Sequence, residues 1–277
     1  MRKIINIHGH LHKEQDVDKK VEEWKSQGVV KYCILAVPRH LQTMGLLGNE
    51  DVKKWMDKHP DFIVGMGGLE LGRNMDRPTR VKELYEEGFQ GLKFIMPMHN
   101  YSDERYFGFY DMAQSLKMPI LFHTGWVTVS DKQNPVRESD ICSEYMRPYH
   151  FDRICREFPD LKIIGAHLGN PHYNEALCVM EQFRNVYYDV TGGSGSRTWL
   201  AKIKYALGEY YKTDVPEEEQ EILEQRFNKL CFGTDNPPVP LWIKNSDELL
   251  DHYNISEETR ENFYWKNAAK IFGWTNI

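Results

Sequence analysis

The sequence lacks the features that mark several classes of protein. Its 277 residues include five cysteines, an odd number, and none of them forms a CxxC pair. Neither a disulfide framework nor a thiolate metal site is therefore indicated, and we expect reduced thiols. No run approaches the roughly 18 apolar residues of a membrane span, and histidines interrupt the first apolar run too early for a signal peptide. These absences predict a cytoplasmic protein that does not bind membranes.

An excess of positive charge is also missing. Thirty-five basic residues stand against 41 acidic ones, for a formal charge of -6. The chain therefore has no general attraction for nucleic acid or anionic lipid, and any anionic ligand must be bound locally. No GxGxxG follows the first apolar run, and the "GGSGS" at residues 192–196 matches no dinucleotide-binding fingerprint.

Apolar, strand-like runs recur eight times along the chain, with helix-like segments between them. The runs are residues 3–9, 29–37, 61–69, 91–96, 119–125, 161–169, 185–193 and 229–237. This alternation predicts a parallel sheet, and eight units suit a closed (β/α)8 barrel, with an open doubly wound sheet as the alternative. We expect one domain over residues 1–277 without a β-sandwich appendage. A last helix over 256–273, with Ser256 as its N-cap, is predicted to close the barrel.

Polar residues occur at the ends of these otherwise apolar runs. In a parallel barrel the active site lies at the carboxyl ends of the strands, so these residues are expected to meet at one rim. The set consists of His8, His10, Lys93, His123, His167 and Asp235.

The first run carries histidines at alternate positions. Residues i and i+2 of a strand point to the same face, about 7 Å apart, so His8 and His10 can converge on one ion. We expect both to face the barrel axis, with Ile5 and Ile7 pointing into the layer between strand and helices. His12 shares their parity but lies beyond the strand, where a solvated loop residue is the favoured interpretation. Several buried imidazoles beside a carboxylate require pairing or a metal, and such ligands suit zinc or a related divalent ion.

Several motifs together resemble one protein family. They are the HxH of His8 and His10, "PILFHTG", "FPDLKIIGAHLGNP", "NVYYDVTGG", "FGTDNP" and the closing "NAAKIFGW". Over nearly its whole length the chain resembles the amidohydrolase superfamily. It is most similar to the compact amidohydrolase 2 branch, which includes aminocarboxymuconate semialdehyde decarboxylase, benzoate-type decarboxylases and lactone hydrolases.

The resemblance implies roles for the rim residues. His8, His10, His123 and Asp235 correspond to the ligands of one divalent metal ion, with zinc favoured and manganese or another divalent ion as alternatives. Asp235 and His167 correspond to catalytic residues, with His167 orienting or protonating the substrate. Asn6 is a departure, because the family often has Asp at that position. Relatives often form homodimers, so a homodimer is compatible with the resemblance.

Other residues are candidates for substrate binding. Lys93 is interpreted as a contact for a substrate anion, with a structural lysine or a carbamylated bridge between two metals as alternatives. The long segment 126–150 is predicted to cover the site, with Trp126 as an apolar wall. Arg137 and Arg147 could clamp a carboxylate, although a surface salt bridge is the alternative for each.

These features lead to a functional hypothesis. The leading prediction is a metal-dependent hydrolase that attacks a small carboxylate-bearing lactone, ester or amide with a metal-activated water. The second hypothesis is a non-oxidative decarboxylase of an aromatic or unsaturated acid that uses the same residues. A non-catalytic, metal-binding barrel is a third.

Overall fold

The protein folds as a barrel of eight parallel strands. The computed structural model describes residues 2–72, 76–127, 142–209, 214–236, 238–275 and 277. The strands are β1 (Ile4–Gly9), β2 (Val29–Leu35), β3 (Ile63–Gly68), β4 (Gly91–Phe94), β5 (Ile120–Phe122), β6 (Ile163–Gly165), β7 (Val186–Asp189) and β8 (Leu230–Cys231). They lie in the order β1 to β8 and every neighbouring pair is parallel. All eight predicted strands, and the (β/α)8 barrel, are thus confirmed.

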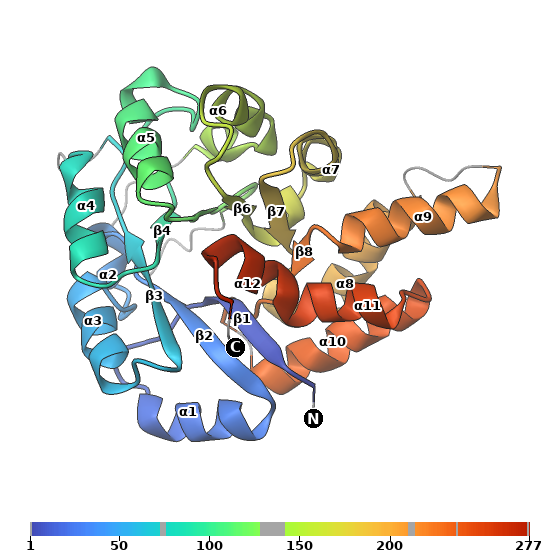
Figure 1. Ribbon diagram of the computed structural model, residues 1–277, viewed down its shortest axis with the longest axis horizontal. Coiled ribbons are helices and arrows are strands. Elements are labelled where there is room, and N and C mark those ends of the chain that lie inside the picture. Colours follow the sequence, from blue (N-terminus) through green and yellow to red (C-terminus); the bar gives the residue numbers. More distant parts are fainter. Residues whose placement is uncertain (1, 73–75, 128–141, 210–213, 237, 276) are drawn as a thin grey trace.

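Helices connect the strands and surround the barrel (Figure 1). They are α1 (Val17–Ser26), α2 (Arg39–Gln42), α3 (Asn49–Lys58), α4 (Thr79–Glu86), α5 (Phe107–Ser115), α6 (Phe151–Glu157), α7 (Tyr173–Gln182), α8 (Arg197–Lys204), α9 (Pro216–Phe227), α10 (Val239–His252), α11 (Glu257–Glu261) and α12 (Asn267–Phe272). The predicted last helix begins as expected, with the Ser256 side chain accepting a hydrogen bond from the Thr259 amide. A π-helical segment, Asn262–Lys266, divides it into α11 and α12.

Backbone hydrogen bonds between β1 and the segment after β8 complete the ring. The Ile7 amide donates to the Phe232 carbonyl at 3.1 Å, and the Asp235 amide donates to the His8 carbonyl at 2.8 Å. The His10 amide donates to the Asp235 carbonyl at 3.0 Å. Because β8 itself has two residues, these bonds supply the connection that a longer strand would make.

Apolar side chains form two layers. The larger layer packs the outer face of the strands on the helices, as where Trp24 of α1 stacks on Tyr32 of β2 with ring centroids 3.8 Å apart. The smaller layer fills the barrel interior and includes Leu35, Met66 and Ile164, together with residues of α12. Helix α12 contacts β1 and β8, and Figure 1 shows it beside β1. It therefore covers the interior at the amino ends of the strands.

The expected orientation of Ile5 and Ile7 is wrong. Both belong to the interior layer, with Leu35 and Met66, instead of the layer between strand and helices. The pairing of β1 with β2 explains the difference, because the four residues from Asn6 to Gly9 oppose only three on β2, Tyr32 to Ile34. Such a register shift lets consecutive residues share a face. Ile7 and His8 can then both lie on the inner side of the barrel.

Other features agree with the composition. The structure shows no disulfide bond between the described cysteines. None of the helices in the described ranges is both long and apolar enough to cross a membrane.

The fold places a close contact between β6 and β7 that can be tested. A Cβ added at Gly165 would lie 2.1 Å from a ring carbon of the buried Tyr188. We predict that Gly165→Ala lowers the free energy of unfolding by about 1–3 kcal/mol, the usual effect of overpacking a core. Urea denaturation measures it. The loss should shrink in a Tyr188→Leu background, and an equal loss in both backgrounds would contradict the contact.

Candidate metal centre and active site

The rim at the carboxyl ends of the strands gathers the predicted polar residues. His8 lies in β1 and Lys93 lies in β4. His10 and His123 directly follow β1 and β5, His167 is the second residue after β6, and Asp235 is the fourth residue after β8. The His8 ring is 5.3 Å from both the His10 and the His167 rings, measured between centroids, and His123 is 4.9 Å from His167. The structure therefore brings the four histidines and Asp235 together.

Asp189, the last residue of β7, organises this group. Its Oδ2 accepts a hydrogen bond of 2.7 Å from Nδ1 of His8, and both side chains are fully buried. Its Oδ1 accepts from the backbone amides of His167 and Thr191 at 2.9 and 3.0 Å. Burial alone would raise the pKa of Asp189, but the charge and the hydrogen bond of His8 outweigh it, so the pKa is lowered. Asp189 therefore remains a carboxylate that only accepts hydrogen bonds.

That carboxylate fixes the tautomers of two histidines. Because Asp189 can only accept, the Thr191 hydroxyl donates to its Oδ1 at 2.6 Å. The Thr191 oxygen is then the acceptor for Nδ1–H of His167 at 2.9 Å. His8 likewise carries its proton on Nδ1, toward Asp189. In their neutral forms both rings present an unprotonated Nε2 elsewhere.

The Nε2 atom of His8 faces the carboxylate of Asp235. The two atoms are 3.4 Å apart, and Nε2 of His10 lies 3.8 Å from the same oxygen. With the proton of His8 on Nδ1, its Nε2 atom and the Asp235 oxygen are both acceptors, so neither can donate a hydrogen bond to the other and their lone pairs repel. A cation held between them turns this repulsion into attraction. His8, His10 and Asp235 form one of two groups of described residues whose donor atoms all lie within 4.8 Å of one another.

Further buried nitrogen atoms in the site lack partners among the described residues. They are Nε2 of His8, Nδ1 of His10, Nε2 of His123 and Nζ of Lys93. Orphaned buried polar atoms are rare in folded proteins and call for an explanation. The Nε2 atoms of His8 and His123 fit a divalent metal, which takes neutral imidazole and carboxylate ligands.

Burial lowers the pKa of three of the histidines, His10, His123 and His167. The pKa of His10 and of His123 lies well below the ordinary value because both are buried, and the neighbouring Lys93 and other histidines lower it further. Burial also lowers the pKa of His167, although Asp235 and Asp189 act in the opposite direction. The pKa of Lys93 falls from 10.5 to about 8 through burial, which the charges of Asp235 and Asp189 only partly offset.

His8, His167 and Asp189 form the second group with metal-ligand spacing. Here the oxygens of Asp189 are already occupied by four hydrogen bonds from the protein. This group is therefore better understood as a hydrogen-bonded support for the rings than as a second metal site.

Two of the rim residues have unusual backbone conformations. His167 has φ = 61° and Asp235 has φ = 55°, both in the left-handed region that favours glycine. The hydrogen bonds of their amides, to Asp189 and to the His8 carbonyl, hold them there. Strained conformations of this kind concentrate at functional sites.

Asn6 has a buried, structural set of contacts. Its side-chain oxygen accepts from the His8 amide at 3.1 Å, and its nitrogen donates to the Thr234 hydroxyl at 2.8 Å. A carboxylate at this position could not donate to Thr234 as the amide does. The amide thus links β1 with the segment that carries Asp235.

The remaining candidates lie farther out. The Trp126 side chain is 64% exposed, and its backbone amide bonds the Asn170 carbonyl at 2.8 Å. The Arg147 guanidinium pairs with Glu144 and Glu175, the salt-bridge alternative. Arg137 lies outside the described residues. The structure does not bring Trp126 or Arg147 into the group around His8, and the substrate roles of all three residues stay predictions.

Sequence reasoning missed the roles of Asp189 and Thr191. The signal that could have revealed Asp189 is a carboxylate at the end of a strand-like run, in "NVYYDVTGG", as for the other rim residues. Thr191 had no such signal, because threonine is common after strands.

Comparisons with known structures agree with the barrel. An uncharacterized TIM-barrel protein from Bordetella bronchiseptica matches with a TM-score of 0.65 and 19% identity, covering 94% of this chain and 84% of that one. A probable 2-pyrone-4,6-dicarboxylic acid hydrolase from Acinetobacter baumannii, with citric acid bound, matches with a TM-score of 0.59 and 12% identity. The match covers 98% of this chain and 100% of that one. A third match is a 5-carboxyvanillate decarboxylase from Novosphingobium aromaticivorans, complexed with manganese and 4-hydroxy-3-methoxy-5-nitrobenzoic acid. It has a TM-score of 0.57 and 15% identity, and the match covers 92% of this chain and 79% of that one.

Sequence comparison identifies the family. No curated protein matches the chain significantly. The sequence model of one family, described as amidohydrolase, matches residues 39–274. Since this range covers most of the chain and the barrel agrees with it, the resemblance is confirmed, and the chain belongs to the amidohydrolase family.

Proposed function

We propose that the protein is a metal-dependent hydrolase of small, carboxylate-bearing lactones, esters or amides. The observation that carries the proposal is the opposition of two lone-pair-bearing atoms, Nε2 of His8 and Oδ1 of Asp235, at 3.4 Å. Family membership supports a metal-dependent enzyme, and structural neighbours include both hydrolases and decarboxylases.

The ion would be held by residues from three strands. His8, His10, His123 and Asp235 offer nitrogen and carboxylate ligands, and the Asp189 bond fixes His8 with its Nε2 available. Zinc is the favoured ion. Manganese is the alternative, and the manganese bound to the decarboxylase neighbour supports it. When bound, the metal would acidify water and polarise the scissile carbonyl.

Asp235 and His167 would handle protons. Asp235 would accept the proton of the attacking water at its carboxylate. The neutral His167, with Nδ1–H bonded to Thr191, presents an acceptor at Nε2. His167 therefore has to receive a proton at Nε2 before it can give one to the leaving group. At 8% exposure His167 has more solvent access than the fully buried His8, which suits a group that meets substrate.

Lys93 would bind the carboxylate of the substrate. Its ammonium group is fully buried at the rim without a partner among the described residues. A carboxylate would supply the charge-assisted hydrogen bond that the protein does not. This need for an anion directs the proposal to acidic substrates.

Decarboxylation is the second candidate, because a decarboxylase shares this fold and the same residues could bind an aromatic acid. The two reactions release different products. The protein should be loaded with zinc or manganese and tested on 2-pyrone-4,6-dicarboxylate and 5-carboxyvanillate, the molecules named for the neighbours. Acid release without carbon dioxide supports hydrolysis. Carbon dioxide release favours the second candidate. If neither acid nor carbon dioxide is released, both candidates are contradicted.

The ligand assignment predicts metal contents. His8→Ala, His10→Ala, His123→Ala and Asp235→Ala should each lose most of the bound ion, because each removes a ligand. Elemental analysis of protein purified without chelators measures this loss. His12→Ala is the matched control and should keep the ion. Full metal content in the four variants would contradict the assignment.

A second prediction concerns His167. His167→Asn should keep most of the metal but lose activity by about 10²- to 10⁴-fold, the typical effect of removing a general acid or base. Turnover and metal content are measured on the same preparation, with His12→Asn as control. Parallel loss of metal and activity would make His167 a ligand, and unchanged activity would place the proton transfer elsewhere.

A third prediction concerns Lys93 and pH. Because its pKa is lowered from 10.5 to about 8, burying the protonated amine opposes folding below pH 8, and the cost vanishes above pH 10.5, where both states are neutral. Lys93→Met should therefore raise the free energy of unfolding of the metal-free protein at pH 7 by up to about 3 kcal/mol. This figure follows because each unit of difference between the folded and unfolded pKa corresponds to about 1.4 kcal/mol. Urea denaturation should show that the gain in free energy of unfolding is smaller at pH 10 than at pH 7.

The same variant should raise KM for acidic substrates, because the anion contact is lost. Lys202→Met, at an exposed position of α8, is the control for both measurements. Lower stability at pH 7 or an unchanged KM would contradict this role for Lys93.

A further inference from the structure

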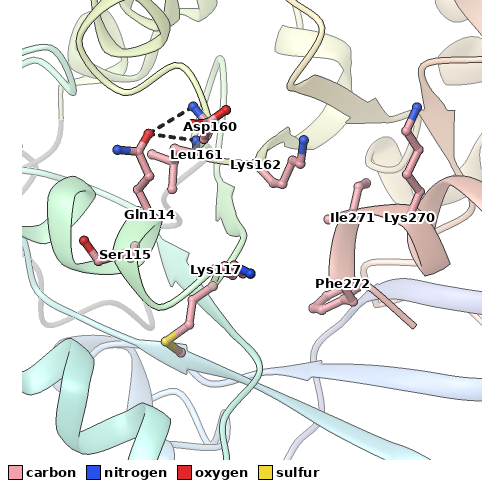
Figure 2. Close-up of a pocket in the computed structure, with 12 residues that line it drawn as sticks. Gln114, Ser115, Lys117, Asp160, Leu161, Lys162, Lys270, Ile271 and Phe272 are labelled. Carbon is pink, nitrogen blue, oxygen red and sulfur yellow. Dashed lines mark hydrogen bonds between the residues drawn. The ribbon is translucent and has the colours of Figure 1, made fainter. Parts of the chain in front are cut away.

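A cavity at the opposite end of the barrel gathers unpaired positive charge. It has a volume of about 660 Å³, and Figure 2 shows its lining. Lys117 and Met118 follow α5 and precede β5, Leu161 and Lys162 precede β6, and the remaining wall comes from the end of α12. The cavity therefore lies at the amino ends of the strands, away from the rim with His8.

Three lysines from three separate segments line this cavity: Lys117, Lys162 and Lys270. None of their ammonium groups has an ion pair or hydrogen bond with a described residue. The lining carboxylate of Asp160 pairs with Arg184 at 3.0 Å, and its charge offsets that of Lys162 only in part. The cavity thus holds more positive charge than its own protein groups balance.

The positive charges affect one another. Partial burial lowers the pKa of Lys162, and the charges of Lys270 and Arg184 lower it further. Lys229 lies next to β8 and has its pKa lowered to about 8, by burial first and then by Lys270 and Lys162. An anion bound between Lys162 and Lys270 would relieve this mutual repulsion.

The rest of the lining is apolar or already satisfied. Met118, Leu161 and Ile271 supply buried apolar surface. Phe272 stacks on Trp274 on one side, with centroids 4.5 Å apart and planes 8° apart. The Gln114 side chain is engaged, since its oxygen accepts from the amides of Asp160 and Leu161 at 3.0 and 3.1 Å (Figure 2). The chemistry left for a ligand is apolar contact together with three ammonium groups.

We propose that this cavity binds a small organic anion with at least two negative charges on an apolar ring. The charged groups contact Lys117, Lys162 and Lys270, and the ring packs on Phe272 and Ile271. Three ammonium groups require more charge than one carboxylate carries, and the apolar wall favours an organic body over a free inorganic ion. A nucleoside monophosphate comes near to this combination, because it joins a doubly charged phosphate to a flat base.

Calorimetric titration of the full-length protein tests the proposal. The probe is adenosine monophosphate, with adenosine as the uncharged body and inorganic phosphate as the charge alone. Adenosine monophosphate should bind at least about tenfold more tightly than either, and more weakly at high salt, because the contacts are ionic. Failure of adenosine monophosphate to bind, or phosphate binding equally well, would overturn the proposal.

Variants locate the binding. Lys162→Gln with Lys270→Gln should weaken adenosine monophosphate binding by about tenfold or more, because two charge-assisted contacts are lost. Lys270→Gln alone should have a smaller effect, and Lys202→Gln on α8 should have none. Thermal melting checks that the variants fold. Equal affinity in the double variant would place the nucleotide elsewhere, for example at the metal centre, and would refute the cavity as its site.

Discussion

The carboxylate of Asp189 is the constraint on which the order of the rim depends. It is fully buried, and a buried carboxylate is costly unless it is paired and hydrogen-bonded. Its partners belong to three different strands or the residues that follow them: the ring of His8 in β1, the amide of His167 after β6, and Thr191 after β7. Satisfying this one charge therefore sets two ring orientations, two tautomers and one left-handed backbone. The candidate metal ligand His8 is thus oriented by a residue that is not itself assigned as a ligand.

Much of the architecture follows from local sequence patterns. Apolar runs of strand length alternate with amphipathic segments, and eight repeats leave few topologies, so the barrel and its strands could be predicted. The rim could also be predicted, because polar residues that end parallel strands must meet at one edge. His8, His10, His123, His167 and Asp235 satisfied that rule without any knowledge of side-chain contacts.

The rest depended on contacts between distant segments. The register shift in β1 turns Ile7 and His8 to the same side, and strict alternation along a strand cannot express such a shift. Arg147 meets Glu175 across 28 residues of sequence, so its ion pairs were invisible in the local pattern. Thr191 gains its role only through the direction in which one hydroxyl hydrogen points. The lysines of the cavity at the amino ends of the strands are likewise distant in sequence. The pairing of β5 with β6 brings the segments of Lys117 and Lys162 together, and α12 adds Lys270.

The seam between β1 and β8 has a consequence for how the protein forms. The backbone of His8 is bonded to Thr234 and Asp235, so the closure of the barrel and the assembly of the candidate metal centre are one event. This contact spans 226 residues of sequence, and closing so large a loop is entropically unfavourable until most of the chain is ordered. A ribosome-bound chain that still lacks β8 has the histidines of the first strand without their carboxylate partner. An ion that needs both His8 and Asp235 as ligands could therefore be bound only after the barrel has closed.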